Sequence, residues 1–249
     1  MFKAVLTEAE LLKNSIPIVA EIIDEGVFKV NQNGINLLSP DRAMVSVVDF
    51  KILSTAFESF TAESSLSLGL NLTHFVNVLK RVRSSDKLTL ESAKDGNKLR
   101  ISLEGNGKRV FEIPVLDVKE EKPPIDQLQF KGKIEIESEI LENGIADAEV
   151  IGDSVVFEAN PESFKMYAKG DVSSAELELR KNDSGLLKLE VTENIRARYP
   201  LEYLKKMIKA AKLSNQASLE FATDYPLKMQ FKSIDKLHLG FILAPRVED

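Results

Sequence analysis

The chain has no cysteine, only two histidines and no long apolar run, and each absence excludes a class of protein. Without cysteine there is no disulfide framework, no thiolate nucleophile and no cysteine-bound zinc. His74 and His238 stand alone, outside any metal-binding spacing such as H-E-x-x-H. Apolar runs such as residues 241–245 are far too short to cross a bilayer, so no membrane partner is expected.

Signals for targeting and for nucleotide cofactors are also missing. Glu8 places an acid too early for the apolar core of a secretory signal, which favours a cytosolic or nuclear protein. There is no Walker A sequence and no glycine-rich phosphate loop, so we expect no cofactor. The net charge of −6, taken alone, argues against nucleic acid. It is an average, however, and the placement of the 33 basic residues matters more.

Two halves of the chain repeat one pattern. Residues 2–38 read as strand, helix, strand, turn and strand, and residues 131–167 read the same way at an offset of 129. A second helix follows in each half, at 72–83 and 200–213, with an offset near 128. Because several elements keep one spacing, we predict two duplicated domains of similar size.

Between the halves lies a segment of acids, lysines and paired prolines. Its composition predicts a semi-extended linker over residues 117–129 rather than a helix or strand. The N-terminal domain then covers residues 1–116 and the C-terminal domain covers residues 130–249.

Most of the remaining segments alternate with period two, as half-buried antiparallel strands do. Asn33-Gly34 and Asp95-Gly96 predict hairpin turns. Pro17 predicts a kink or an interruption in the first helix, because proline removes a backbone hydrogen bond. The fold class is therefore α+β, with a largely antiparallel sheet system in each domain and two helices on one side of it.

The second helix of each half has a basic outer face. In 200–213 an apolar stripe at helical spacing consists of Leu201, Leu204, Met207, Ile208 and Ala211. The other side of this helix carries Lys205, Lys206, Lys209 and Lys212, with Glu202 as its only acid. In 72–83 the side chains outside the apolar stripe include Lys80, Arg81 and Arg83.

Lysines on one solvated helix face are ordinary and would mean little alone. Two equivalent basic helices in an acidic protein favour a functional patch. Neither helix interleaves exposed aromatic residues with its charges, which argues against stacking on single strands. No base-reading motif is present either. Contact with phosphates, independent of base sequence, is the interaction that remains.

Four segments carry a family resemblance: Gly34–Val48, Leu70–Arg81, Asp224–Met229 and the terminal Leu243–Asp249, which reads LAPRVED. Together they resemble DNA sliding clamps of the proliferating cell nuclear antigen family, and the resemblance covers the whole chain, including the linker. The cysteine-free, charge-rich composition looks more archaeal than eukaryotic. An archaeal source implies a cytoplasmic, nucleoid-associated protein, and a eukaryotic source implies a nuclear one.

The resemblance implies the DNA clamp fold, in which three subunits form a pseudo-sixfold ring with sheets outside and helices lining a central channel. It implies a non-enzymatic processivity factor for DNA polymerase that encircles double-stranded DNA and tethers replication and repair proteins. The residues expected to face DNA are Lys13, Lys80, Arg81, Arg83, Lys205, Lys206, Lys209 and Lys212. The helix 138–149 departs from the family pattern, because it carries four acids and no basic residue.

The resemblance also implies a pocket for client proteins under the linker. DNA polymerase, the clamp loader, flap endonuclease and DNA ligase would bind it through short peptide motifs. Carried over by position, the pocket consists of Pro40, Met44, Val45, Val47, Ile125, Pro226, Ile242, Ala244 and Pro245. The simpler alternative is that Val45 and Val47 are core strand residues.

The family pattern joins subunits by pairing the strand 108–116 of one chain with the strand 174–181 of the next. Acids of the helix 138–149 would then face basic residues of the neighbour. The expected interface residues are Arg83, Lys108, Arg109, Val110, Glu139, Glu142, Asp147 and Leu177. The alternative is that Val110 and Leu177 hold the joint without help from charge. The sequence leaves open whether the three chains are identical or related.

Two other function classes stay open. Asp41, Asp49 and Asp117 could form the metal site of a carboxylate-dependent enzyme, although no supporting motif accompanies them. The chain could also be a scaffold of duplicated domains that binds proteins and never meets DNA.

Overall fold

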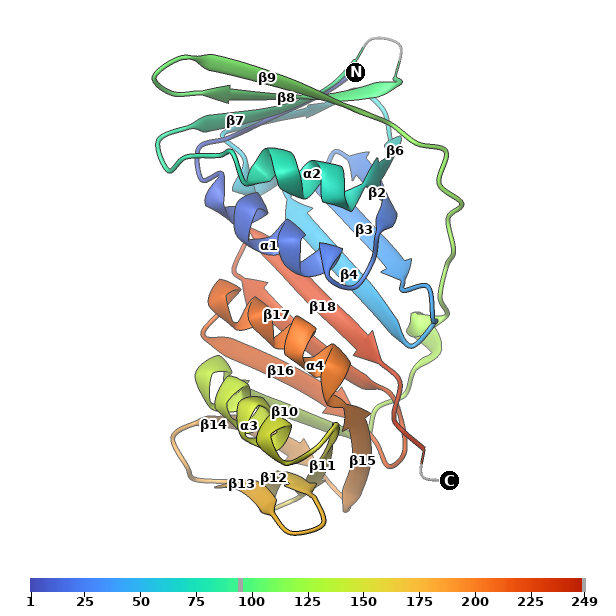
Figure 1. Ribbon diagram of the computed structural model, residues 1–249, viewed down its shortest axis with the longest axis vertical. Helices are drawn as coiled ribbons and strands as arrows, with labels where there is room; N and C mark the ends of the chain where they lie inside the picture. The colour runs from blue at the N-terminus through green and yellow to red at the C-terminus, as the bar shows by residue number, and fades with distance from the viewer. Residues whose placement is uncertain (94–95, 248–249) are drawn as a thin grey trace. The chain divides into compact units, whose positions relative to one another are not determined.

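The structure, a computed structural model, describes residues 1–93 and 96–247. It divides into two compact units (Figure 1). The first unit comprises Met1–Arg42, Val48–Pro123 and Ser233–Leu239. The second unit comprises Ala43–Val47, Pro124–Lys232 and Gly240–Asp249. Each unit therefore includes a short segment from the other half of the sequence.

The first unit combines two groups of strands with the helices α1 (Glu10–Ala20) and α2 (Leu72–Leu79), which lie side by side (Figure 1). One sheet has the strand order β5-β1-β7-β8-β9, and the other group has the order β4-β3-β2-β6. The strands are β1 Phe2–Leu6, β2 Glu25–Asn31, β3 Gly34–Pro40, β4 Ser46–Leu53, β5 Ser59–Ala62, β6 Leu66–Asn71, β7 Lys87–Ser92, β8 Lys98–Glu104 and β9 Lys108–Pro114, with a short 3-10 turn η1 at Ser54–Ala56.

The second unit repeats this plan. Its strands have the orders β13-β12-β11-β15 and β14-β10-β16-β17-β18. Its helices are α3 (Ser138–Ile151) and α4 (Leu201–Met207), and α4 continues as the 3-10 helix η3 (Ile208–Leu213). The strands are β10 Gly132–Glu137, β11 Ser154–Asn160, β12 Ser163–Lys169, β13 Ser174–Arg180, β14 Leu186–Val191, β15 Ile195–Pro200, β16 Gln216–Phe221, β17 Leu227–Ser233 and β18 Leu237–Leu243.

The duplication is regular at the level of whole elements. The elements β2, β3, α2, β7, β8 and β9 each begin 129 residues before β11, β12, α4, β16, β17 and β18 respectively. Glu25 and Ser154, for example, open β2 and β11. The predicted repeat and the α+β class with antiparallel pairing are confirmed.

Several helices differ from their predicted extents. The segment 72–83 is helical only to Leu79, where the Lys80 amide donates to the Val76 carbonyl and the Arg81 amide donates to the Val78 carbonyl, both at 2.9 Å. The segment 200–213 is an α-helix only to Met207 before it tightens into η3. In the first helix Pro17 causes no interruption, because α1 runs through it to Ala20. The acidic helix extends beyond residue 149 to Ile151.

Two glycines permit close approaches of the backbone. Gly34 forms the expected turn with a φ of +137°, and a Cβ there would lie 2.1 Å from the Ile52 carbonyl oxygen. Gly69 has no side chain, which lets the backbone of Leu116 approach closely just before the linker: a Cβ on Gly69 would lie 2.1 Å from the Leu116 carbonyl oxygen. The Leu116 amide donates to the Gly69 carbonyl at 2.8 Å. The predicted turn at Asp95-Gly96 lies partly outside the described residues, since Asp95 is not among them.

The linker contains little regular structure. Residues 117–124 are neither helix nor strand, and a short 3-10 turn, η2, follows at Ile125–Gln127. Glu120 forms an ion pair with Lys29 of β2, so the beginning of the linker is held against the first unit.

Each unit has an aromatic core. In the first unit Leu12, Ile16 and Phe75 of the helices meet side chains of both strand groups around a cavity of about 20 Å³. In the second unit Phe157 lies edge-on to Phe164 and Tyr199, with ring centroids 5.7 and 5.4 Å away. The buried Tyr199 hydroxyl donates to the Tyr225 carbonyl at 2.8 Å, and burial raises the pKa of Tyr199, so the phenol stays neutral.

The segment Ser233–Leu239 is fastened into the first unit by specific bonds. The Leu53 amide donates to the Lys236 carbonyl at 2.9 Å. The Lys236 ammonium forms an ion pair with Glu8 at 2.8 Å. His238 Nε2 lies 3.4 Å from the carboxylate of Asp49. The first unit is thus completed by residues near the end of the chain.

Candidate functional site

The basic face of the second unit is built on α4 and η3. Leu201, Leu204 and Met207 are buried, as predicted, and the lysines emerge on the other side. Lys205, Lys209 and Lys212 are exposed, and Lys206 is half-buried with its ammonium 5.3 Å from the centre of the Tyr203 ring. The structure therefore brings all four predicted lysines onto one continuous segment.

The change from α-helix to 3-10 helix alters which side chains lie on the same face. Ala210 is buried, whereas the predicted core residue Ala211 is only half-buried. A 3-10 helix has three residues per turn, so positions three apart are eclipsed. Met207 and Ala210 then point inward together, and Lys209 and Lys212 point outward together.

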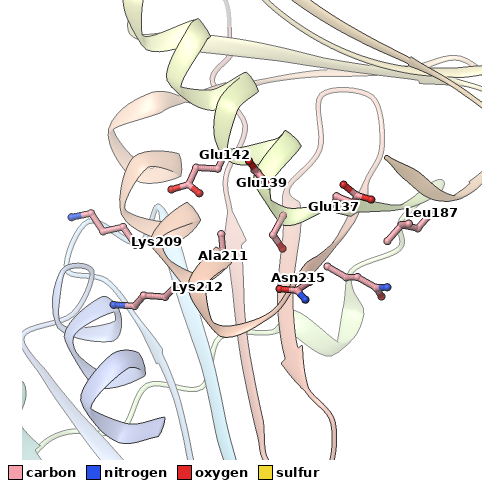
Figure 2. Close-up of a pocket in the computed structure, with 10 residues that line it drawn as sticks. Glu137, Glu139, Glu142, Leu187, Lys209, Ala211, Lys212 and Asn215 are labelled. Atoms are coloured by element: carbon pink, nitrogen blue, oxygen red, sulfur yellow. The ribbon is translucent and has the colours of Figure 1, made fainter. Parts of the chain in front are cut away.

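Acidic side chains of α3 accompany these lysines. Lys205 forms an ion pair with Glu149 of α3, and Lys206 forms a looser one with Glu202 at 3.7 Å. An open groove of about 930 Å³ is lined by Glu139 and Glu142 on one side and by Lys209 and Lys212 on the other. In Figure 2, Glu142 extends from α3 toward the segment that carries both lysines. The basic face is thus partly neutralised within its own chain.

The basic residues of the first unit lie mainly beyond a helix rather than on it. Lys80, Arg81 and Arg83 are exposed in the turns that follow α2, with Val82 buried between them. The Arg81 and Val82 amides donate to Val78 and Leu79, which holds the turns in place. Lys13 is on α1 and pairs with Glu10 one turn away at 3.2 Å.

Asp86 organises this turn. Its side chain is only 3% exposed and accepts a hydrogen bond from the Arg83 amide at 2.8 Å. It also forms an ion pair with Arg109 of β9, whose guanidinium donates to the Arg81 carbonyl at 3.0 Å. The Arg83 amide and then the Arg109 guanidinium hold the pKa of Asp86 below its ordinary 3.8.

The residues predicted to form a client pocket are half-buried, except for Met44, which is exposed. Pro40, Val45, Val47, Ile125, Pro226, Ile242, Ala244 and Pro245 are all half-buried. Val47 lies on β4, and Val45 and Val47 are both half-buried rather than fully buried. Met44 is 61% exposed and has a φ of +57°, a conformation that non-glycine residues seldom adopt.

The second unit brings some of these residues into one groove. Val45, Ala244 and Pro245 line an open groove of about 790 Å³, together with residues at the end of α3 and the start of α4. The Ala244 amide donates to the Val45 carbonyl at 2.9 Å. Arg246 fixes the chain beyond them, through Asp153 at 2.6 Å and the Arg198 carbonyl at 2.7 Å. Pro40 is not among the described residues that line this groove, and it belongs to the first unit.

The strands predicted for the subunit joint are edge strands. Among the described strands, β9 lies at the end of its sheet beside β8, and β13 lies at the end of its sheet beside β12. Val110 of β9 is 41% exposed. Leu177 of β13 is half-buried under α3, where a Cβ on Gly144 would lie 2.9 Å from it. Lys108 pairs with Glu104 at 2.7 Å, and Arg109 is engaged by Asp86.

Sequence reasoning missed the partners of several predicted residues. It named Lys205 and Arg109 without their pairing to Glu149 and Asp86. It quoted Arg246 without its partner Asp153. The acidic composition of 138–149 was the one available signal for Glu149, and no local pattern pointed to Asp86 or Asp153.

The metalloenzyme alternative gains no support. Across residues 1–93 and 96–247, no three histidine, aspartate or glutamate side chains gather as a metal site would require. Asp49 is instead bonded to Lys51 at 3.0 Å, and Asp41 is buried. Within the same ranges, no helix is both long and apolar enough to span a membrane.

Comparison with known families decides among the remaining readings. The model for "Proliferating cell nuclear antigen, N-terminal domain" matches residues 1–121. The model for the C-terminal domain of the same antigen matches residues 124–246. The chain belongs to the proliferating cell nuclear antigen family. Its function is that of a DNA polymerase sliding clamp.

Individual members of the family agree along the whole length. The chain is 35% identical over 248 residues to a DNA polymerase sliding clamp from Thermococcus gammatolerans, covering 100% of this chain and 99% of the relative. It is 33% identical over 241 residues to a sliding clamp from Nanoarchaeum equitans, covering 96% and 97%. The crystal structure of proliferating cell nuclear antigen from Thermococcus kodakaraensis superposes with a TM-score of 0.91 at 28% identity, covering 99% of this chain and 100% of that one.

Replacing Arg109 with glutamine should change the acid stability of the fold. Because the folded pKa of Asp86 is depressed, its carboxylate stabilises the folded state above pH 3.8, and this contribution is lost as the pH falls through the folded pKa. Arg109→Gln should therefore unfold at a higher pH than wild type and lose more stability at pH 7 than at pH 2. Denaturant titrations across this range, with exposed Arg100→Gln as control, test it. Identical pH profiles for Arg109→Gln and wild type would contradict the role of Arg109.

Proposed function

We propose that three copies of this chain, or this chain with related clamp chains, close into a ring around duplex DNA and tether DNA polymerase to it. The observation that carries the proposal is that the chain contains two equivalent units in which corresponding segments, the turns after α2 and the segment α4 with η3, bear exposed basic residues. Phosphate contacts from such segments need no base sequence. The closed ring then stays on the DNA because it encircles the duplex, and tight binding is not required.

The DNA-facing residues in this proposal are the predicted basic ones: Lys13, Lys80, Arg81, Arg83, Lys205, Lys206, Lys209 and Lys212. A cationic lining that is spread over many weak contacts attracts phosphates at long range without fixing the ring at one position. The partial pairing of Lys13, Lys205 and Lys206 with acids fits this weak, diffuse mode.

Reversing the charge of four lysines should weaken the clamp without unfolding it. We expect the variant Lys80→Glu, Lys205→Glu, Lys206→Glu, Lys209→Glu to lose most polymerase stimulation and retention on circular DNA at moderate salt. The control reverses four lysines on or beside strands, Lys3, Lys98, Lys131 and Lys188, and should retain both activities. Each assay compares circular DNA with linear DNA, from which a ring slides off.

Undiminished stimulation by the four-lysine variant would remove these residues from the DNA interface. Equal retention of the wild type on circular and linear DNA would instead contradict encirclement itself.

We propose that clients bind the half-buried apolar residues around Met44 and Ile242. DNA polymerase, the clamp loader, flap endonuclease and DNA ligase would insert aliphatic and aromatic anchors there. Apolar anchors in a small concave pocket dominate the energy of such interfaces. The exposure of Met44 supports this role, because a large apolar side chain at 61% exposure leaves much apolar surface to cover.

Met44→Glu should reduce the affinity for a client peptide by at least tenfold, because complex formation would bury an unpaired charge. Calorimetry with a peptide from a client polymerase measures this. Ile234→Glu, at an exposed apolar residue in the β17–β18 turn, is the matched control and should bind as the wild type does. Equal affinity for Met44→Glu and wild type, with both folded, would rule out this pocket.

We propose that β9 of one chain pairs with β13 of the next, since both strands have an unpaired edge. Arg109 is already held by Asp86, so its part in the joint is to support β9 and the preceding turn. Arg83 has its backbone fixed by Asp86 while its side chain is exposed, which leaves it available to an acid such as Asp147 of a neighbouring copy. Each exposed ion pair contributes only ~0–1 kcal/mol to the stability of the joint. Apolar contact by Val110 therefore also stabilises it.

Val110→Glu should convert the ring into monomers or open oligomers. With a chain mass of 27.8 kDa, a closed trimer sediments at about 83 kDa and a monomer at 27.8 kDa. Leu187→Glu is the control, because Leu187 is also 41% exposed and also lies on an edge strand, β14. A Val110→Glu chain that remains fully trimeric at micromolar concentration would exclude this joint.

The proposed role is non-enzymatic. The relatives described above are archaeal, which supports an archaeal source and a place on the chromosome in the cytoplasm.

A further inference from the structure

The four acids of α3 do not share one face. Glu142 and Glu149 are seven residues apart, which is close to two helical turns, so they lie on the same side of α3. That side faces α4 and η3, because Glu149 pairs with Lys205 and Glu142 shares a groove with Lys209 and Lys212. Asp147 lies elsewhere. It is three residues after Gly144, whose side of the helix packs on Leu177 of β13.

The charges of the two segments nearly cancel. α3 carries four acids and no basic residue, whereas α4 with η3 carries four lysines and one acid. The first unit has no such arrangement, because α2 carries no acidic, lysine or arginine residue and Lys80, Arg81 and Arg83 follow it. The two units of one chain therefore present very different net charge on equivalent elements.

We propose that α3 is an internal counter-charge for the lysines of α4 and η3, with Glu149 and Glu142 as positioning residues that weaken the grip of these lysines on DNA phosphates. This inference rests on the proposed function, since it concerns the same lysines. Glu149 holds the Lys205 ammonium at the helix surface, and a phosphate must displace it to gain the contact. Glu142 lies across the groove from Lys209 and Lys212 and lowers the local positive potential in the same way (Figure 2).

The consequence is a lining whose strength differs between the two units. The basic turn after α2 has no acidic helix opposite it in its own unit, since α1 carries one lysine beside one acid in Glu10–Ala20. In the second unit, carboxylates of α3 lie beside the lysines and reduce their attraction for phosphates. Removing one carboxylate should therefore add about one phosphate contact per chain, which steepens the dependence of log K on log salt by about 0.9 for each chain of the ring that gains a contact.

The test measures binding of the assembled clamp to a short fluorescent duplex by anisotropy between 50 and 200 mM salt. We compare wild type, Glu149→Gln, Lys205→Gln and the double variant. Glu149→Gln should bind more tightly at low salt and lose more affinity than wild type across this range, by a factor of about three for each chain of the ring that gains a contact. Lys205→Gln should bind more weakly than wild type, and the double variant should match Lys205→Gln alone. Glu149→Asp, which keeps the charge, should behave as wild type.

The control for net charge is Glu193→Gln, which removes an exposed carboxylate that pairs with Lys131 away from α3. It should leave the salt slope unchanged. If Lys205→Gln weakens binding and Glu149→Gln matches wild type, the counter-charge inference fails and the proposed function stands. If neither Lys205→Gln nor the four-lysine variant weakens binding, the DNA assignment of this face fails. A double variant that binds as tightly as Glu149→Gln would show that the acid does not act through Lys205.

Discussion

Each helix of the two units buries one apolar face against strands, and this packing determines which side chains reach the surface. In α4 the burial of Leu201, Leu204 and Met207 forces the lysines between them outward. In α3 the burial of Leu141, Ile145 and Ala148 does the same for the acids. The surface chemistry of the clamp therefore follows from the core, because a change in helix register would turn lysines inward and apolar residues outward.

Because the core fixes position and not charge, equivalent elements have been free to diverge in charge. α2 and α4 begin 129 residues apart and pack alike, yet only α4 carries lysines along its length. A sliding clamp needs a lining that attracts DNA but does not hold it, since each tight phosphate contact would have to break before the ring moves. In the proposed lining, pairing a lysine with a carboxylate on a neighbouring helix would meet this need at little cost to folding, because exposed ion pairs contribute only ~0–1 kcal/mol.

The periodicities of the sequence were sufficient for the duplicated plan, the antiparallel strands and the outward lysines. They were insufficient where the outcome depended on contacts distant in sequence. Asp86 and Arg109 are 23 residues apart and meet only because β9 folds back beside the turn after α2. The early end of α2 at Leu79 and the tightening of α4 at Ile208 are further examples, since both segments keep an apolar period that a longer α-helix would also satisfy. The pocket residues were assigned by resemblance, and their half-buried state had no sequence signal.

The exchange of segments between the units affects when the first unit can fold during synthesis. The first unit requires Ser233–Leu239, which Lys236 fastens through Glu8 and through its carbonyl to Leu53. A ribosome releases the N-terminal residues first, so most of the first unit emerges long before this last strand segment is synthesised. Until then the nascent first half has no partner for the Leu53 amide. The native form of that unit is therefore reached only after residues 233–239 have been synthesised, so the first half of the chain depends on a segment of the second.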